Sequence, residues 1–210
     1  MTFASRKDAG EKLGRALAAR QVHADVILGL PRGGVLVAAE VARILKRPLD
    51  VLVVRKIGHP RFREFAVGAL AEAETVVLDQ EVAERTSAAR EELDEIIVEE
   101  TARLKDYLRK FEHGKRSPLA GKTVVLVDDG LATGATIEAA VRSAKKQGAR
   151  RITVAVPVAS TQGMSRLAPV SDDAVALLID PDFQAVGQYY GNFPQTTDEE
   201  VLRALERGAS

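Results

Sequence analysis

Short apolar runs alternate with amphipathic stretches along most of the chain. The apolar runs are continuous, which is typical of strands that are buried on both faces of a parallel sheet. They predict strands at 26–30, 52–54, 124–127, 152–156 and 174–178. Between them, apolar residues recur at intervals of three and four, which predicts helices. The order of elements therefore alternates between strand and helix.

Four helices of ordinary length follow from this spacing. Each has an apolar face on one side and charged residues on the other, as expected for helices that cover a sheet. Serine, threonine and aspartate favour helix starts, and glycine favours helix ends. The predicted limits are Ser5 as the first cap with a face through Leu17, 35–45 for the second helix, Gly148 as the end of the third, and Thr197 or Asp198 through Leu205 for the last.

A second kind of pattern occupies the middle of the chain. Residues 57–65 are expected to form a polar loop, and 66–70 and 75–78 two short strands of a ribbon. Residues 86–111 predict a long amphipathic helix whose other face is dense in Glu, Arg and Lys. An ordinary solvated face explains these charges. The apolar seam could pack on the core or on a second subunit.

Strands that alternate with helices favour an α/β fold, with a mostly parallel sheet between two layers of helices. A chain of 210 residues suits a single domain, and we expect 1–210 to form one. Ligands of such sheets bind at the carboxyl ends of the strands. Three polar segments follow predicted strands and should share that edge: 31–34, 55–56 and 128–136.

Composition excludes several functions. The net charge is zero, so no general attraction to nucleic acid or membranes is expected, and anions must be bound by local cations. The chain has no cysteine, and its three histidines are far apart, which argues against disulfides and a zinc site. Charge precedes any apolar run at the N-terminus, and no run is long enough to span a membrane. A soluble, cytoplasmic protein is expected.

The most specific chemistry lies at 124–136. A buried strand delivers two adjacent carboxylates, Asp128 and Asp129, to the edge of the sheet. Adjacent carboxylates repel each other unless donors or a metal compensate, and the two hydroxyls of a ribose are suitable donors. Glycines and threonines then open a helix, whose N-terminal amides favour an anion. The pattern predicts a site for a ribose 5-phosphate.

Other readings of this run fit less well. A nucleotide P-loop requires GxxxxGK[ST], and 128–137 contain no lysine. A dinucleotide fingerprint requires GxGxxG, which neither glycine loop contains. Asp128 and Asp129 could simply start a turn and cap a helix, but that explanation leaves the remainder of the loop without a reason.

The segment 124–136 resembles the motif by which type I phosphoribosyltransferases bind 5-phosphoribosyl 1-pyrophosphate (PRPP). The resemblance covers roughly 25–160 and is closest to a bacterial group known only by that general name. It implies a three-layer, mostly parallel fold of the type I kind. The core would lie at about 20–158 with a helical insertion at about 80–113. A small hood would lie at about 157–195 together with N-terminal residues.

The resemblance also implies roles for individual residues. Asp128 and Asp129 would hold the ribose hydroxyls, and the loop 31–34, often with a non-proline cis peptide in the family, would bind pyrophosphate. Arg55 and Lys56 match the family's basic position after the second strand, although a solvated strand end also explains them. The loop around the 5′-phosphate would be Gly130, Leu131, Ala132, Thr133, Gly134, Ala135 and Thr136. The pyrophosphate group would contact Arg32, Gly33, Gly34, Arg55 and Lys56. The catalytic set would be Asp128, Asp129, Arg32 and Lys56.

The resemblance leaves the acceptor open. Members that use 6-oxopurines carry an aspartate where this chain has Ala132, which argues against that mechanism, whereas members that use adenine or uracil tolerate alanine. Glu64 is the only loop acid that matches the mobile acid of adenine enzymes, and an exposed loop glutamate explains it better. Phe183 could stack on a base or belong to the core of the hood.

The expected activity is transfer of the 5-phosphoribosyl group to a nitrogenous base with release of pyrophosphate. Mg²⁺ would be bound through the substrate, with no direct protein ligand expected beyond a contact to Asp128 and Asp129. A homodimer is expected, with small-molecule partners and without nucleic acid or membrane. The alternative is a non-catalytic sensor of PRPP or nucleotides with the same fold. Arg32 and Lys56 favour catalysis, because a sensor of a nucleoside monophosphate has no need of pyrophosphate contacts.

Overall fold

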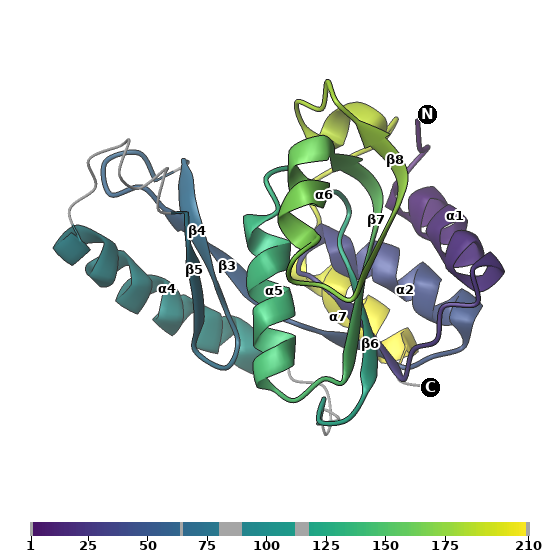
Figure 1. Ribbon diagram of the computed structural model, residues 1–210, viewed down its shortest axis with the longest axis horizontal. Coiled ribbons are helices and arrows are strands. Elements are labelled where there is room, and N and C mark those ends of the chain that lie inside the picture. The colour runs from purple at the N-terminus through teal and green to yellow at the C-terminus, as the bar shows by residue number, and fades with distance from the viewer. Residues whose placement is uncertain (1, 64, 80–89, 112–117, 209–210) are drawn as a thin grey trace.

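The protein is built around a five-stranded parallel sheet (Figure 1). The computed structural model describes residues 2–63, 65–79, 90–111 and 118–208. The strand order is β2-β1-β6-β7-β8, so the chain starts near one edge and crosses the middle before reaching the other. The strands are β1 (Val26–Gly29), β2 (Leu49–Val51), β6 (Thr123–Val127), β7 (Arg151–Ser160) and β8 (Asp173–Asp180).

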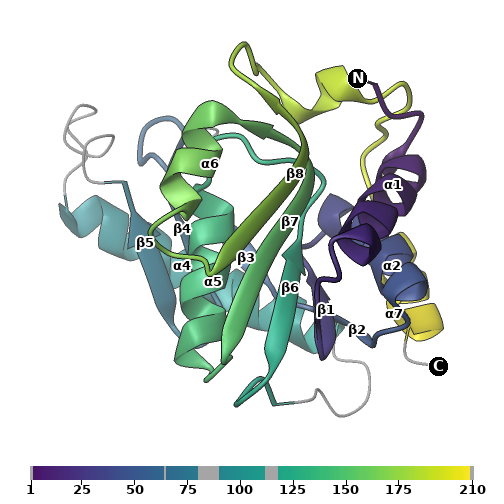
Figure 2. The same ribbon diagram turned by 45° about the vertical axis from the view of Figure 1, so that its right-hand side comes forward.

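Helices cover both faces of this sheet, which confirms the three-layer prediction (Figure 2). One face is covered by α1 (Arg6–Ala19), α2 (Gly33–Leu45) and α7 (Asp198–Gly208). The other is covered by α5 (Ala135–Lys146) and α6 (Thr161–Leu167). Because helices lie on both sides, every residue of β1 and β6 is buried, which explains their continuous apolar runs.

A second, antiparallel sheet forms a separate lobe. It consists of β3 (Val54–Gly58), β4 (Ala66–Ala71) and β5 (Thr75–Leu78), in that order. One face packs on α5 and the other on α4 (Arg90–Lys110). Helix α5 therefore lies between the two sheets, and this is why even Glu138 and Ser143 are buried in it. The two sheets share one continuous set of packing contacts through this helix.

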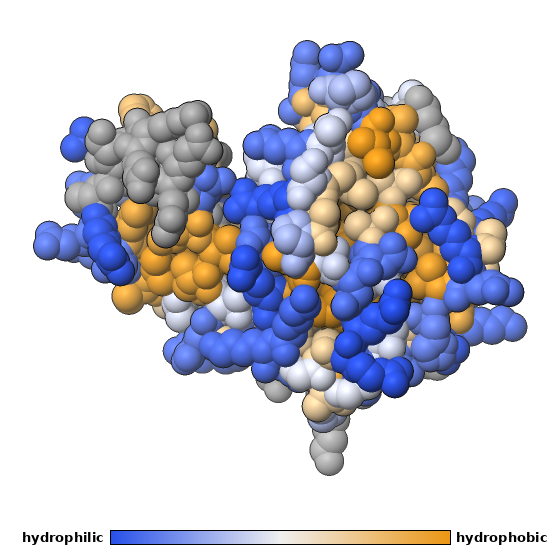
Figure 3. All heavy atoms as spheres, in the orientation of Figure 1, coloured by the Kyte–Doolittle hydropathy of each residue, from blue (hydrophilic) through white to orange (hydrophobic). Residues whose placement is uncertain are grey.

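The apolar seam of the long helix packs on this lobe. Leu93, Ile96 and Leu104 of α4 are buried against the second sheet. The part of the prediction that covers 86–89 lies outside the described residues. On the outer side of the lobe, Val76 and Leu78 are partly exposed, and apolar atoms gather on this part of the surface (Figure 3). None of the described helices is both long and apolar enough to cross a membrane.

One predicted strand is wrong. Residues 52–54 were expected in the main sheet, but the sheet strand is β2, and β3 begins at Val54 in the other sheet. The chain changes sheets between them because the Leu52 amide still donates to Gly29 O (3.1 Å), while the Val53 amide donates to Glu72 Oε1 (2.7 Å). Apolarity alone does not distinguish the two sheets, since both bury these residues.

Three further differences concern the segment predicted as the hood. Strand β7 continues to Ser160, four residues beyond the predicted end at Val156, because its extension pairs with β8 on one side and with Leu131 on the other. Strand β8 completes the main sheet. Helix α6 and the short η1 (Val186–Tyr189), a 3₁₀ turn, were not predicted. The residues that rise beyond the carboxyl edge of the sheet are thus mainly those after β8, packed on Phe3.

Candidate functional site

The acidic pair stands at the carboxyl end of the central strand. Asp128 and Asp129 follow β6 directly, and the Asp129 amide donates to Asp128 Oδ1 (2.8 Å). The neighbouring strand is tied to the same point, since the Leu30 amide donates to Val127 O (2.9 Å). The end of β1 and the acidic pair are therefore adjacent, as the parallel order of the strands predicts.

The loop at 31–34 lies directly against the two carboxylates. The peptide bond between Pro31 and Arg32 is cis, which confirms the expectation from the family resemblance. A Cβ on Gly33 would lie 2.0 Å from Asp129 Oδ2, and one on Gly34 would lie 2.7 Å from Asp128 Oδ1. Only glycine fits at these two positions, because any side chain would occupy the space of the carboxylates.

A residue that the sequence analysis missed completes this group. Arg6, in the first turn of α1, forms an ion pair with Asp129, with 2.8 Å between Nε and Oδ2. Its side chain is 10% exposed and that of Asp129 is 16% exposed. Arg6 Nη1 also donates to Pro194 O (2.8 Å), and the guanidinium lies 3.7 Å from the centre of the Phe193 ring. Arg6 thus joins the N-terminal helix, the acidic pair and the hood.

A weak signal for Arg6 exists in the sequence. A cation in the first turn of a helix opposes the helix dipole, so an arginine directly after a serine cap needs a reason. The cap is confirmed, since Ser5 Oγ accepts from the Asp8 amide. The reason is the carboxylate, which is 123 residues away in the chain and cannot be found from local spacing.

The hood contacts the acidic pair through a tyrosine. Tyr190 is buried, and its hydroxyl donates to Asp129 O (2.6 Å). Its ring packs on Phe3 and Phe193, with centroid distances of 5.5 and 4.8 Å. A backbone hydrogen bond joins the same segments, since the Phe3 amide donates to Tyr189 O (2.7 Å). N-terminal residues therefore pack with the segment after β8.

The pKa of each carboxyl group is raised above its ordinary value. Desolvation by the surrounding protein raises the pKa of Asp128 well above its ordinary value, and the adjacent charge of Asp129 raises it further. Desolvation also raises the pKa of Asp129, against the hydrogen bond and the charge of Arg6, which lower it. The pKa of Asp128 is raised more than that of Asp129, because only Asp129 has a direct cationic partner in the contacts that the structure describes.

The predicted phosphate loop leads from the acidic pair into α5. Gly134 has a positive φ of 84° and precedes the first helical residue, Ala135. Ala132 and Thr133 are exposed, while Leu131 is buried and pairs with Ala159 of β7. The start of α6 fixes the loop from outside. Ser160 Oγ donates to Ala132 O (2.5 Å) and accepts from the Gly163 amide (2.8 Å).

The basic residues of the predicted pyrophosphate group have different surroundings. Arg32 precedes Gly33 in the loop that contacts the acidic pair, and its Nη1 is 3.7 Å from Asp198 Oδ1 at the start of α7. Lys56 is exposed, and its charge lowers the pKa of both Asp128 and Asp129. Arg55 directly precedes Lys56 in β3, so the two side chains lie on opposite faces of the strand.

Arg55 is held by the long helix. Its Nε lies 2.8 Å from Glu100 Oε2, and its guanidinium lies 5.2 Å from the centre of the Tyr107 ring. Glu100 is 7% exposed and needs a cationic partner in that position. The structure therefore gives Arg55 a structural contact and separates it from Lys56, with which the sequence analysis grouped it.

The acceptor candidates are also separated. The Phe183 ring stacks on Tyr189 at a centroid distance of 5.4 Å and packs on the hood cluster around Phe3. These contacts favour the alternative in which Phe183 belongs to the core of the hood. Glu64 lies outside the described residues.

The fold and this site together define a class of protein. A parallel sheet carries an acidic pair, a glycine loop that opens a helix, and a second glycine loop with a cis peptide at one edge. That arrangement is of the phosphoribosyltransferase type. Residues 6–191 match the phosphoribosyl transferase domain family, and the chain belongs to that family.

Known proteins resemble the chain over nearly all of its length. The crystal structure of TT1426 from Thermus thermophilus is 42% identical and covers 100% of both chains, with a TM-score of 0.80. A purine phosphoribosyltransferase structure from Pyrococcus horikoshii shares the fold, at 21% identity over 94% of this chain and 95% of that chain, with a TM-score of 0.51.

A longer relative is found in Mycobacterium tuberculosis. It bears the provisional name of a phosphoribosyl transferase and is 44% identical over 206 residues, which are 98% of this chain and 46% of the relative. The chain thus spans about half the length of the curated relative that it matches.

Proposed function

We propose that this protein transfers the 5-phosphoribosyl group of PRPP to a nitrogenous base and releases pyrophosphate. The observation that carries the proposal is the acidic pair after β6, in contact with the glycine loop that contains the cis peptide. A ribose that carries phosphates at both ends needs acceptors for its hydroxyls between two anion sites, and this edge of the sheet offers that order.

Each part of PRPP has a proposed set of contacts. Asp128 and Asp129 accept from the ribose hydroxyls, and the loop from Gly130 to Thr136 surrounds the 5′-phosphate at the start of α5. The side chains of Thr133 and Thr136 add donors. Arg6 contacts one oxygen of Asp129 and lowers the pKa of that carboxyl against the effect of desolvation, so we assign it a positioning role.

The leaving group would be held on the other side of the acidic pair. Arg32, Lys56 and the amides of Gly33 and Gly34 are the proposed pyrophosphate contacts. Holding the reactants and stabilising the charge of the departing pyrophosphate are the main contributions expected of the protein. Arg55 stays a weaker candidate, because Glu100 engages it.

Mg²⁺ is proposed to arrive with PRPP. No group of three or more His, Cys, Asp or Glu side chains that could hold a metal ion occurs in the described part of the chain. Asp128 and Asp129 supply oxygen ligands that suit Mg²⁺, but a pair leaves most of its positions to phosphate and water. Bound in this way, the ion would neutralise phosphate charge.

The proposal also covers the choice of acceptor base, a homodimer and a cytoplasmic location. Ala132 supplies no general base, so the hood and the exposed loop residues are proposed to select the base. A homodimer could use the exposed apolar side chains of β5 and α4. A cytoplasmic location is consistent with PRPP as substrate.

The direct test is pyrophosphate release from PRPP and Mg²⁺ with a panel of purine, pyrimidine and other nitrogenous bases. The wild-type protein should release pyrophosphate with at least one base, and Asp129→Asn should reduce the rate by a factor on the order of 100 to 1000. Binding of PRPP measured in parallel separates the alternatives. Tight PRPP binding without release for any base would favour a sensor of the same fold over a transferase.

Arg6→Met should weaken PRPP binding about tenfold near neutral pH. Arg6 lowers the pKa of Asp129, so without it the carboxyl becomes protonated at a higher pH and the acidic limit of PRPP binding moves upward. The check is the dissociation constant of PRPP measured across a pH series. Arg6→Lys retains a cation and should move the limit less, whereas an unmoved limit in Arg6→Met would contradict the positioning role.

A further inference from the structure

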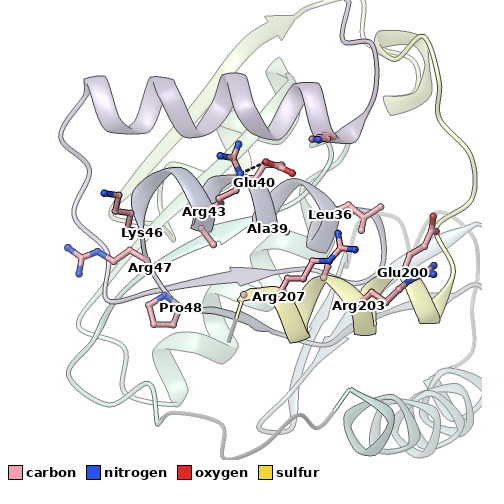
Figure 4. A pocket seen from close by; sticks show the side chains of 14 residues that line it. Leu36, Ala39, Glu40, Arg43, Lys46, Arg47, Pro48, Glu200, Arg203 and Arg207 are labelled. Carbon is pink, nitrogen blue, oxygen red and sulfur yellow. Dashed lines mark hydrogen bonds and ion pairs between the residues drawn. The ribbon is translucent and has the colours of Figure 1, made fainter. Parts of the chain in front are cut away.

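A groove runs between α2 and α7 (Figure 4). Its volume is about 1040 Å³. It follows α2 from Leu36 to Arg43, the turn from Lys46 to Pro48, and α7 from Glu200 to Gly208, and Figure 4 shows side chains of both helices along it. None of its lining residues belongs to the proposed PRPP contacts.

The groove concentrates positive charge. Six cations line it, from α1, α2, the turn after α2, and α7: Lys7, Arg43, Lys46, Arg47, Arg203 and Arg207. Two carboxylates, Glu40 and Glu200, also line it, and Arg43 is engaged by Glu40 at 2.8 Å and by Glu11 at 3.7 Å. Five other cations still line the groove. The chain as a whole has equal numbers of acidic and basic residues, so this is a local accumulation. Cations gathered around a concave surface attract anions with several charges.

The floor of the groove limits the kind of occupant. It consists of small apolar side chains such as Ala39, Ala42 and Ala204, together with Leu36 and Pro48. Protein partners usually anchor through large side chains that fill deep pockets, and an alanine floor offers none. The volume is close to the range of small-molecule sites. Affinity must therefore come mainly from the charged rim.

We propose that this groove binds an elongated polyphosphate, either free or carried by a nucleotide. Cations line the groove along its length: Arg203 and Arg207 lie on α7, and Lys46 and Arg47 lie at the end of α2 (Figure 4). A chain of phosphates laid along the groove could contact cations from both helices. Arg203 and Arg207 are exposed, and no contact to a carboxylate is described for either, which leaves their charge available to a ligand.

The groove lies near the proposed PRPP site through α2, which carries Gly33 and Gly34, and through the contact of Asp198 with Arg32. Helix α2 begins at Gly33, next to the cis peptide, and α7 begins at Asp198. Asp198 Oδ1 is buried and lies 3.7 Å from Arg32, without a hydrogen-bond partner in the described residues.

The test is calorimetric titration of the full chain with inorganic tripolyphosphate and, separately, with ATP, both without Mg²⁺. The double variant Arg203→Gln, Arg207→Gln should weaken binding at least about tenfold, because two charge-assisted contacts are lost. The matched control is Arg15→Gln, Arg109→Gln, which removes two arginines that are 77% and 76% exposed and lie outside the groove. The control should bind like the wild type.

Two further readouts locate the ligand. Amide hydrogen exchange should show protection of α7 on addition of tripolyphosphate to the wild type and not to the groove variant. Tighter binding of ATP than of tripolyphosphate assigns the site to a nucleotide, and equal binding assigns it to the polyphosphate chain itself. Equal affinity of the two double variants, or protection confined to 128–136, would overturn the proposal, since binding would then occur at the PRPP site or by net charge alone.

Discussion

Asp128→Asn is expected to raise the melting temperature of the protein while abolishing its use of PRPP. Desolvation and the charge of Asp129 raise the pKa of Asp128 in the folded protein. A carboxyl whose pKa is higher in the folded state than in the unfolded state binds its proton more tightly when folded. Its ionisation therefore lowers stability as the pH rises from the unfolded pKa through the folded pKa.

Asparagine removes this cost without removing the local hydrogen bond. The Asp129 amide donates to Asp128 Oδ1, and the side-chain oxygen of asparagine can accept the same bond. At neutral pH we expect a gain on the order of 1 kcal/mol, or about 2 to 4 °C for a chain of this size. PRPP binding should fall because a neutral amide accepts less strongly from a ribose hydroxyl than a carboxylate does.

The neighbouring substitution provides the control. Asp129→Asn removes the partner of Arg6, which is 10% exposed, so the variant should gain no stability and should lose some. The measurements are thermal unfolding of both variants and the wild type at several pH values. The wild type should lose stability between mildly acidic and neutral pH relative to Asp128→Asn. A lower melting temperature for Asp128→Asn at neutral pH would show that Asp128 is stabilising in the absence of ligand.

Gly33→Ala is expected to disrupt both the folded edge of the sheet and PRPP binding. The new Cβ would lie 2.0 Å from Asp129 Oδ2 and 2.7 Å from Arg6 Nε. Neither atom can yield without breaking the ion pair between them, and the loop cannot retreat because it is joined directly to α2. Overpacking of this kind costs about 1 to 3 kcal/mol.

The functional effect of Gly33→Ala should exceed its effect on stability. Displacement of the acidic pair or the loop by about 1 Å is enough to reduce turnover on the order of 100-fold. Gly191→Ala is the matched control, because its Cβ would meet the Ala4 carbonyl oxygen at 3.6 Å, an ordinary contact in the same region. Thermal unfolding and PRPP titration of both variants are the measurements. Wild-type PRPP affinity in Gly33→Ala would exclude close approach of the loop to the acidic pair.

Much of the fold was predictable because its signals are local. The continuous apolar runs identified β1, β6, β7 and β8, and helical spacing identified α1, α2, α5 and α7. The serine cap and the cis peptide before Arg32 are confirmed. Burial on both faces of a sheet requires apolar residues at successive positions, and so it is visible in the chain itself.

The sheet change at Leu52 and Val53 was not predictable in the same way. Both residues are buried, and their apolarity is equally compatible with either sheet. The decision comes from hydrogen-bond partners that are distant in the chain, such as Glu72. The length of β7 has the same origin, since its last residues pair with β8, and Ala159 also pairs with Leu131.

The sequence by itself determined the order of strands and helices, the acidic pair after β6, and the glycine loops at the same edge. These features depend on residue types at short spacing. The tertiary structure alone decided which cations serve the pair. It brought Arg6 to Asp129 across 123 positions, placed Arg32 beside Asp198, and turned Arg55 toward Glu100. Charges act over a few ångströms of space whatever their separation in the chain, so only the folded arrangement assigns their partners.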